Sequence, residues 1–236
     1  AVVSSIGMAL LHPWYAGGWL VPGRARRNLA QHLHFGGRAV AVNVTEYLGV
    51  FLTQIGISRG PGSAELGQWN RAAVFSQMPI QLLTLPANRV LYPELGERWD
   101  REGGRTILGG VVYVMTWVAV SGALIWGAIL VLLLPTFLGS GWDLAGWLAW
   151  PLSLAAGLGL AATAMTSALM AGNRFPSLTR LQFASSGLLG LSAVATLCTG
   201  NMWWTAAALP VAALLRYVLA SRACRRSGYL HDGAEL

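Results

Sequence analysis

The sequence predicts an all-α protein, a polytopic bundle of transmembrane helices. Hydrophobic residues make up 55% of its 236 residues and charged residues only 11%, whereas a soluble domain of this size carries about 25% charge. Glycine and tryptophan, which are enriched in membrane helices and at their interfaces, number 29 and 11. Most of the chain is therefore expected to lie outside water, and the long apolar stretches described next support this prediction.

A helix needs about 20 mostly apolar residues to cross a membrane. Six stretches of the chain meet this requirement, and we expect each to form one membrane helix. They are residues 37–57, 68–92, 106–134, 146–172, 177–198 and 202–220.

The N-terminal residues are apolar but make a poor complete span. Residues 1–12 are followed by Pro13, Gly17 and Gly18, which disfavour a helix interior. We interpret residues 1–22 as the end of a preceding membrane helix and its linker.

The next segment, residues 23–36, is basic and modestly amphipathic. We expect it to form a short cytoplasmic helix on the inner membrane surface, held by anionic lipid; a plain basic loop is the alternative. Residues 37–221 then form a six-helix transporter lobe, and residues 222–236 form a cytoplasmic tail.

Arginine placement predicts the orientation. All sixteen basic residues are arginines, grouped in short clusters near the ends of the apolar stretches. When alternate gaps are assigned to alternate sides, fourteen arginines fall on one side, while Arg59 and Arg71 fall on the other. The positive-inside rule makes the richer side cytoplasmic. We therefore expect a multi-pass protein of the bacterial inner membrane with both ends of this chain in the cytoplasm.

Two further features fit this interpretation. The arginines do not form one continuous basic stripe, so the net charge of +7 does not indicate nucleic-acid binding. Tryptophans cluster near the predicted outer ends of the helices, as in the aromatic belts of membrane proteins. They are Trp69, Trp142, Trp147, Trp150, Trp203 and Trp204.

The sequence shows no catalytic constellation. It contains no nucleophile motif, no nucleotide-binding loop and no pair of carboxylates at a useful spacing. The histidines and cysteines lack the spacing of a metal site, and Cys198 and Cys224 are expected at opposite membrane faces. We therefore expect neither an enzyme nor a bound metal or cofactor.

Polar residues form a row on the first predicted span. On a helical wheel they fall within about 120° of one another, and Glu46 lies roughly at mid-span. An intramembrane carboxylate is a functional candidate by default, although Glu46 could instead pair with an arginine for structure. The members of this row are Asn43, Glu46, Tyr47, Thr53 and Gln54.

The second predicted span carries a narrower polar row, within about 60° on the wheel, with Pro79 and Pro86 on the opposite face. Its members are Asn70, Gln77, Gln81, Thr84 and Asn88. Such a row faces a watery cavity or other helices, because exposing polar side chains to lipid costs free energy. We predict a translocation path, with helix-to-helix hydrogen bonding as the alternative. The predicted path is lined by Asn43, Glu46, Gln54, Gln77, Gln81, Thr84 and Asn88.

Three segments carry a family resemblance. Residues 66–72 read Leu-Gly-Gln-Trp-Asn-Arg-Ala, and residues 89–95 read Arg-Val-Leu-Tyr-Pro-Glu-Leu. Residues 137–142 read Phe-Leu-Gly-Ser-Gly-Trp. Their order and spacing resemble the C-terminal half of bacterial polysaccharide flippases of the multidrug/oligosaccharidyl-lipid/polysaccharide exporter superfamily. Members often carry an aspartate late in the first helix of this half, where this sequence has Thr53.

The resemblance implies a function. The chain would be one lobe of a transporter that moves a polyprenyl-diphosphate-linked oligosaccharide from the inner to the outer leaflet by alternating access. Expected partners are this lipid-linked oligosaccharide, membrane lipids, and a polysaccharide polymerase or glycosyltransferases. Arg38, Arg59 and Arg71 are candidates for the lipid diphosphate, since guanidinium groups match phosphate oxygens bidentately; alternatively, they anchor helix ends.

Two other functions stay open at this point. One is a drug or metabolite antiporter of the same superfamily, which requires a small cavity with an essential carboxylate. The other is a membrane assembly subunit without transport activity, in which the polar rows are buried between helices.

Overall fold

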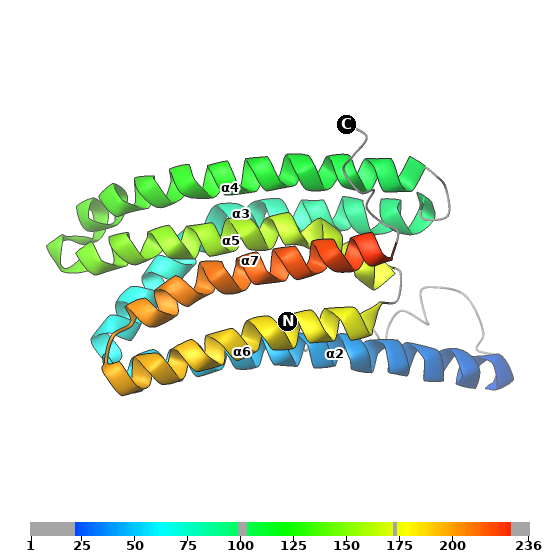
Figure 1. Cartoon of the computed structure of the whole chain (residues 1–236), viewed down its shortest axis with the longest axis horizontal. Helices are drawn as coiled ribbons and strands as arrows, with labels where there is room; N and C mark the ends of the chain where they lie inside the picture. The colour runs from blue at the N-terminus through cyan, green and yellow to red at the C-terminus, as the bar shows by residue number, and fades with distance from the viewer. Residues whose placement is uncertain (1–21, 99–102, 172–173, 228–236) are drawn as a thin grey trace. The chain divides into compact units, whose positions relative to one another are not determined.

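The structure is a computed structural model that describes residues 22–98, 103–171 and 174–227. Within these residues, side chains are described except at 22–35, 38–39, 84–98, 103–108, 140 and 171. The described elements are all helical, which confirms the predicted fold class (Figure 1). They are α2 (Pro22–Arg59), α3 (Ser63–Arg98), α4 (Gly103–Leu138), the short 3-10 turn η1 (Ser140–Trp142), α5 (Asp143–Ala171), α6 (Phe175–Thr199) and α7 (Trp203–Arg226).

The chain divides into two compact units at Ala41 and Val42. The described part of the first unit is the N-terminal stretch of α2, residues 22–41. The expected surface segment 23–36 therefore belongs to one uninterrupted helix that runs on to Arg59. The predicted remnant helix in residues 1–22 lies outside the described residues apart from Pro22.

The second unit, from Val42 onward, holds the helix bundle. Five helices in the described part of the chain are long and apolar enough to cross a membrane. The remaining predicted span, 68–92, forms α3. This helix is long enough at 36 residues but does not meet the same criterion of apolarity. Polar residues in its first five turns explain the difference. The five candidate spans are Val40–Arg59, Gly109–Leu138, Asp143–Met170, Phe175–Thr199 and Trp203–Arg226.

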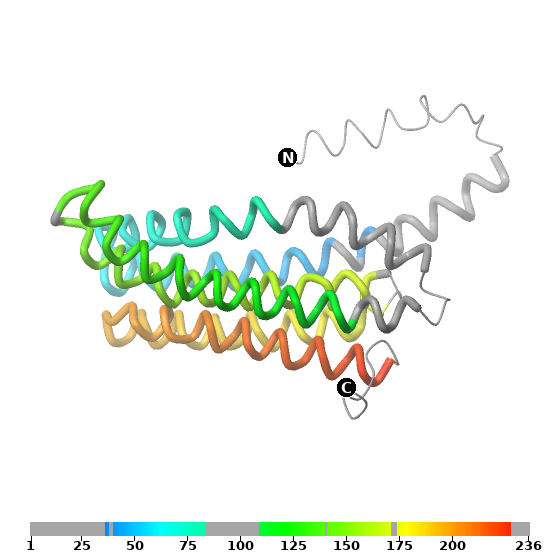
Figure 2. The backbone as a smooth tube through the Cα atoms, turned by 90° about the horizontal axis from the view of Figure 1, so that it is seen from above, coloured from blue at the N-terminus to red at the C-terminus, as the bar shows by residue number. Residues whose placement is uncertain are grey.

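Helix α5 lies at the centre of the bundle. It packs against α3, α4 and α7, and it touches α6; Figure 2 shows it between α3 and α7. Two thirds of its candidate span is buried inside the protein, the largest share among the five. Its small residues, among them Ala161, Ala164 and Ala168, are fully buried and allow neighbouring helices to approach closely.

Helix α2 packs on α6 through glycines. A Cβ atom added at Gly56 would lie 2.6 Å from the carbonyl oxygen of Ala193, and one at Gly60 would lie 2.6 Å from that of Thr196. Only glycine permits backbones this close, as in the small-residue motifs of membrane helices. The Ser186 hydroxyl adds a hydrogen bond of 2.9 Å to the carbonyl oxygen of Thr45.

Three tight connections meet at one end of the bundle, which we call the short-turn end. They lie at residues 60–62, 139–142 and 200–202, and each contains a glycine with positive φ: Gly62, Gly139 and Gly200. The Gln68 amide at the start of α3 donates to the carbonyl oxygen of Gly141, which joins the first two connections. The helices therefore alternate in direction, as the predicted topology requires.

One predicted interfacial tryptophan belongs to the core instead. Trp69 is 5% exposed and packs with Ile57, Ala72 and Met202 near the short-turn end. Trp147, Trp150, Trp203 and Trp204 are exposed, as expected of an aromatic belt. Trp69 was misassigned because nearness to a helix end does not reveal which face of the helix a residue occupies.

Candidate functional site

Helix α3 has a packing face fixed by hydrogen bonds to two neighbours. The Ser76 hydroxyl donates to the carbonyl oxygen of Ala149 on α5 at 3.1 Å, and the Trp126 indole N–H on α4 donates to that of Phe75 at 2.9 Å. The Gln68 side chain also accepts a hydrogen bond from the backbone N–H of Ala145 at 3.0 Å. These contacts set the rotation of α3 in the bundle, and so decide which residues it exposes.

The exposed face of α3 carries the amides. Asn70, Gln77 and Gln81 are all exposed, and the Gln81 amide donates to the Gln77 side-chain oxygen at 3.4 Å. Thr84 and Asn88 continue the same row in sequence, but their side chains lie outside the described residues. Amides that turn away from the helices packing on α3 are free to hydrogen-bond with polar ligands such as sugar hydroxyls.

The opposite side of α3 borders an apolar cavity shared with α4. Its volume is about 220 Å³, and its lining includes Ser76, Pro79, Ile80, Gly122 and Trp126. Pro79 thus lies away from the amides, as the helical wheel predicted. The cavity lining is almost wholly apolar, so it does not belong to the predicted polar path.

On α2 the predicted polar row divides between two environments. Asn43, Tyr47 and Gln54 are exposed, whereas Thr53 is 4% exposed and donates its hydroxyl to the carbonyl oxygen of Gly49 at 3.0 Å. The grouping of Thr53 with the others was wrong, because an arc of about 120° is wide enough to cover both an exposed face and a packing face. Thr53 belongs to the face that meets α6.

Glu46 forms an ion pair with Arg216 of α7. The distance from Arg216 Nη1 to Glu46 Oε1 is 2.9 Å, with side-chain exposures of 27% for Arg216 and 45% for Glu46. Arg216 Nε is buried and has no hydrogen-bond partner among the described residues. Glu46 lies inside the candidate span Val40–Arg59.

Two of the candidate diphosphate-binding arginines, Arg59 and Arg71, lie apart from this pair. Arg59 ends α2 and Arg71 lies in the third turn of α3, so both are at the short-turn end, and both are exposed. The side chain of Arg38 is outside the described residues. Arg71 directly follows Asn70 and borders the amide row. Among the described residues, no group of three or more acidic, histidine or cysteine side chains has a metal-site arrangement.

Sequence reasoning missed Arg216. It was counted with the C-terminal cluster, but it lies inside the span Trp203–Arg226, ten residues before its end. The signal was present, because a lone arginine within an apolar stretch needs a partner in the membrane. The next residue, Tyr217, lies with its hydroxyl 3.1 Å from that of Thr116 on α4, so two neighbouring residues join α7 to α2 and to α4.

A comparison with protein families now adds context. Residues 1–145 match a family described as "Polysaccharide biosynthesis protein". The chain belongs to this family. The matched region includes Glu46 and the whole amide row of α3, and it ends near the start of α5. The same comparisons found no match among the curated proteins and none among the solved structures.

Membership in the family confirms the resemblance predicted from the sequence. It places the protein in polysaccharide biosynthesis, and the five apolar helices indicate a multi-pass membrane protein. The exposed amides and the Glu46–Arg216 pair are two polar features of this bundle.

Proposed function

We propose that this protein is a flippase that moves a polyprenyl-diphosphate-linked oligosaccharide from the inner to the outer leaflet of the bacterial cytoplasmic membrane. The observation that carries the proposal is the exposed amide row of α3, in which Asn70, Gln77 and Gln81 turn away from α4 and α5. Family membership supplies the polysaccharide substrate class. Amides are suited to sugar hydroxyls because each offers both donors and an acceptor.

In this proposal the protein works by alternating access, and no bond is made or broken. The exposed faces of α2 and α3 border a cavity shared with a second lobe, which gives the oligosaccharide a polar route through the membrane. Both ends of the chain are cytoplasmic. A polysaccharide polymerase or glycosyltransferases use the delivered substrate or supply it.

The test replaces Gln77 and Gln81 together by leucine in the full-length protein. The variant is expressed in cells that lack the wild-type gene, and surface polysaccharide and lipid-linked oligosaccharide are both measured. We expect normal protein level, reduced surface polysaccharide and accumulation of the lipid-linked precursor in the inner leaflet. The matched control is Leu82→Ala, which changes an exposed apolar residue on the same helix and should leave export unchanged.

Other outcomes would separate the competing functions. Loss of polysaccharide without accumulation of the precursor would favour an assembly subunit, because the step that fails would then not be transport of the precursor. Normal polysaccharide export with altered drug resistance would favour an antiporter. Either result would overturn the proposed flippase function.

A further inference from the structure

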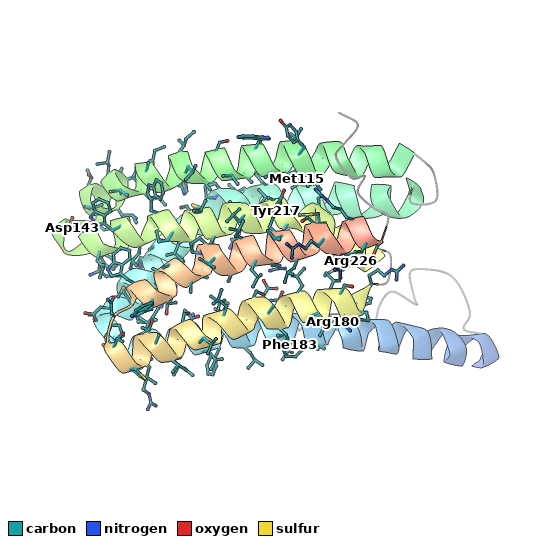
Figure 3. The ribbon with its side chains drawn as sticks, viewed as in Figure 1. Met115, Asp143, Arg180, Phe183, Tyr217 and Arg226 are labelled. Atoms are coloured by element: carbon teal, nitrogen blue, oxygen red, sulfur yellow. The ribbon has the colours of Figure 1, made fainter. Side chains whose placement is uncertain are left out.

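A second polar feature lies at the end of the bundle opposite the short turns. The start of α6 and the end of α7 border an open pocket of about 410 Å³. Four arginines line it, Arg174, Arg180, Arg222 and Arg226; Figure 3 shows Arg180 and Arg226 at this end, far from Asp143. We call this the four-arginine pocket. It lies outside the matched family region and takes no part in the amide row.

The helix periodicity explains how the arginines converge. On α7 the lining residues Leu219, Arg222, Ala223 and Arg226 recur every three or four positions and so share one face. On α6 the lining residues Ser177, Arg180 and Leu181 do the same. The two faces pack against each other, which brings positive charges from both helices around one space.

In the part of the chain that the structure describes, the charges of this pocket have no acidic partner. Within the described residues, none of the four arginines makes an ion pair with a carboxylate. Arg222 and Arg226 are four residues apart on one helix, an arrangement in which like charges repel. The N-terminus of α6 also lacks a side-chain cap, and a helix N-terminus adds positive potential. An anion in the pocket would relieve all of these repulsions.

The pocket would lie at the depth of the lipid headgroups in a membrane that α6 and α7 cross. It sits at the ends of two candidate spans, Phe175–Thr199 and Trp203–Arg226. Arg180 follows Phe175 by five residues, roughly 8 Å along the helix. Leu181, Leu219 and Ala223 give the pocket an apolar part beside its arginines. This combination suits an amphiphile, with its phosphates on the guanidinium groups and its first carbons on the apolar residues.

We propose that the four-arginine pocket binds the phosphates of an anionic lipid that carries two of them. Basic pockets between membrane helices bind such headgroups, and arginine forks match phosphate oxygens bidentately. Two lipid classes share this chemistry: a diphosphatidyl phospholipid and a polyprenyl diphosphate. The site does not depend on which substrate the amide row transports.

The test measures lipid binding to the purified full-length protein by native mass spectrometry. The probes are cardiolipin, undecaprenyl diphosphate, phosphatidylglycerol and the zwitterionic phosphatidylethanolamine. The test variant is Arg180→Gln/Arg222→Gln. Its control is Arg225→Gln. Arg225 is an exposed arginine in the same turn of α7, but it does not line the pocket.

We expect the two-phosphate lipids to bind more tightly than the other two. The double variant should lose about tenfold or more in affinity, as expected for charge-assisted hydrogen bonds, and Arg225→Gln should lose less than about twofold. Preference for cardiolipin would identify a phospholipid site, and preference for undecaprenyl diphosphate would identify a site for the polyprenyl carrier. Equal losses in the double variant and the control, or equal binding of phosphatidylethanolamine, would overturn the proposal.

A folding defect would not leave the question open. Arg180→Lys/Arg222→Lys keeps both charges and loses the bidentate geometry, so it should fold and show an intermediate loss. If that variant bound the two-phosphate lipids as wild type and Arg226→Gln did too, the pocket would not be their site.

Discussion

Glu46 of α2 and Arg216 of α7 are 170 positions apart in the chain, yet their charged groups meet at 2.9 Å. This ion pair joins α7 to α2. The exposed face of α2 carries Asn43 and Gln54. Glu46 therefore already has a partner for its carboxylate.

The first prediction concerns the energy of this pair. Glu46→Gln and Arg216→Gln should each lower the thermal stability of the purified full-length protein, and the double variant should lose less than the sum. We expect a coupling of about 1–2 kcal/mol, below that of a fully buried pair because Glu46 is 45% exposed. Glu46→Gln combined with Arg225→Gln is the control and should show no coupling. Additive losses at Glu46 and Arg216 would show that the contact contributes nothing.

The second prediction concerns the contact between α2 and α6. Gly56→Ala should destabilise the protein by about 1–3 kcal/mol, because its Cβ would lie 2.6 Å from the carbonyl oxygen of Ala193. Gly122→Ala in α4 is the matched control, since a Cβ there meets open space. Helix propensity should make the control neutral or more stable by up to about 1 kcal/mol. Similar melting temperatures for the two variants would contradict the close packing.

The third prediction concerns cysteine accessibility and topology. Cys198 is exposed and lies by the short-turn end, whereas Cys224 is buried against α5, with its sulfur 3.6 Å from the carbonyl oxygen of Met165. In intact cells an impermeant maleimide should label Cys198 from outside, and Cys224→Ala should not change the signal. Labelling of Cys198 only after the cells are opened would reverse the predicted orientation.

The fourth prediction concerns Arg71. If it holds the lipid diphosphate, Arg71→Ala should strongly reduce polysaccharide export at normal protein level, and Arg71→Lys should reduce it less, because lysine keeps the charge but not the fork. An anchoring role predicts near-normal export in Arg71→Lys, since both side chains reach the interface. Wild-type export in Arg71→Ala would exclude a role in substrate binding.

Helix positions were predictable from the sequence because membrane spans are long and their apolar composition is a strong signal. The span predicted at 177–198 became Phe175–Thr199, and the one at 146–172 became Asp143–Ala171. At α2, one helix covers both the basic amphipathic segment and the predicted span. Gly36 and Gly37 stand at this change of composition, yet both belong to α2.

The candidate site was predictable only in part. The amides of α3 lie within about 60° on the wheel, so periodicity predicted their shared face. The exposure of Asn70, Gln77 and Gln81 needed the structure. The partner of Glu46 could not be predicted in this way, because contacts between α2 and α7 depend on how helices distant in sequence pack together. The four-arginine pocket was missed for the same reason: its arginines belong to two helices and were counted only as topological signals.

The modest apolarity of α3 has a consequence for how the protein is made. This helix emerges from the ribosome before α4 and α5, yet the hydrogen bonds of Phe75, Ser76 and Gln68 all lead to residues of α4, α5 and the connection between them. A segment with this many polar groups gains little by entering lipid alone. Its integration should therefore wait until α4 and α5 have been synthesised, so that these three helices enter the bilayer as one group.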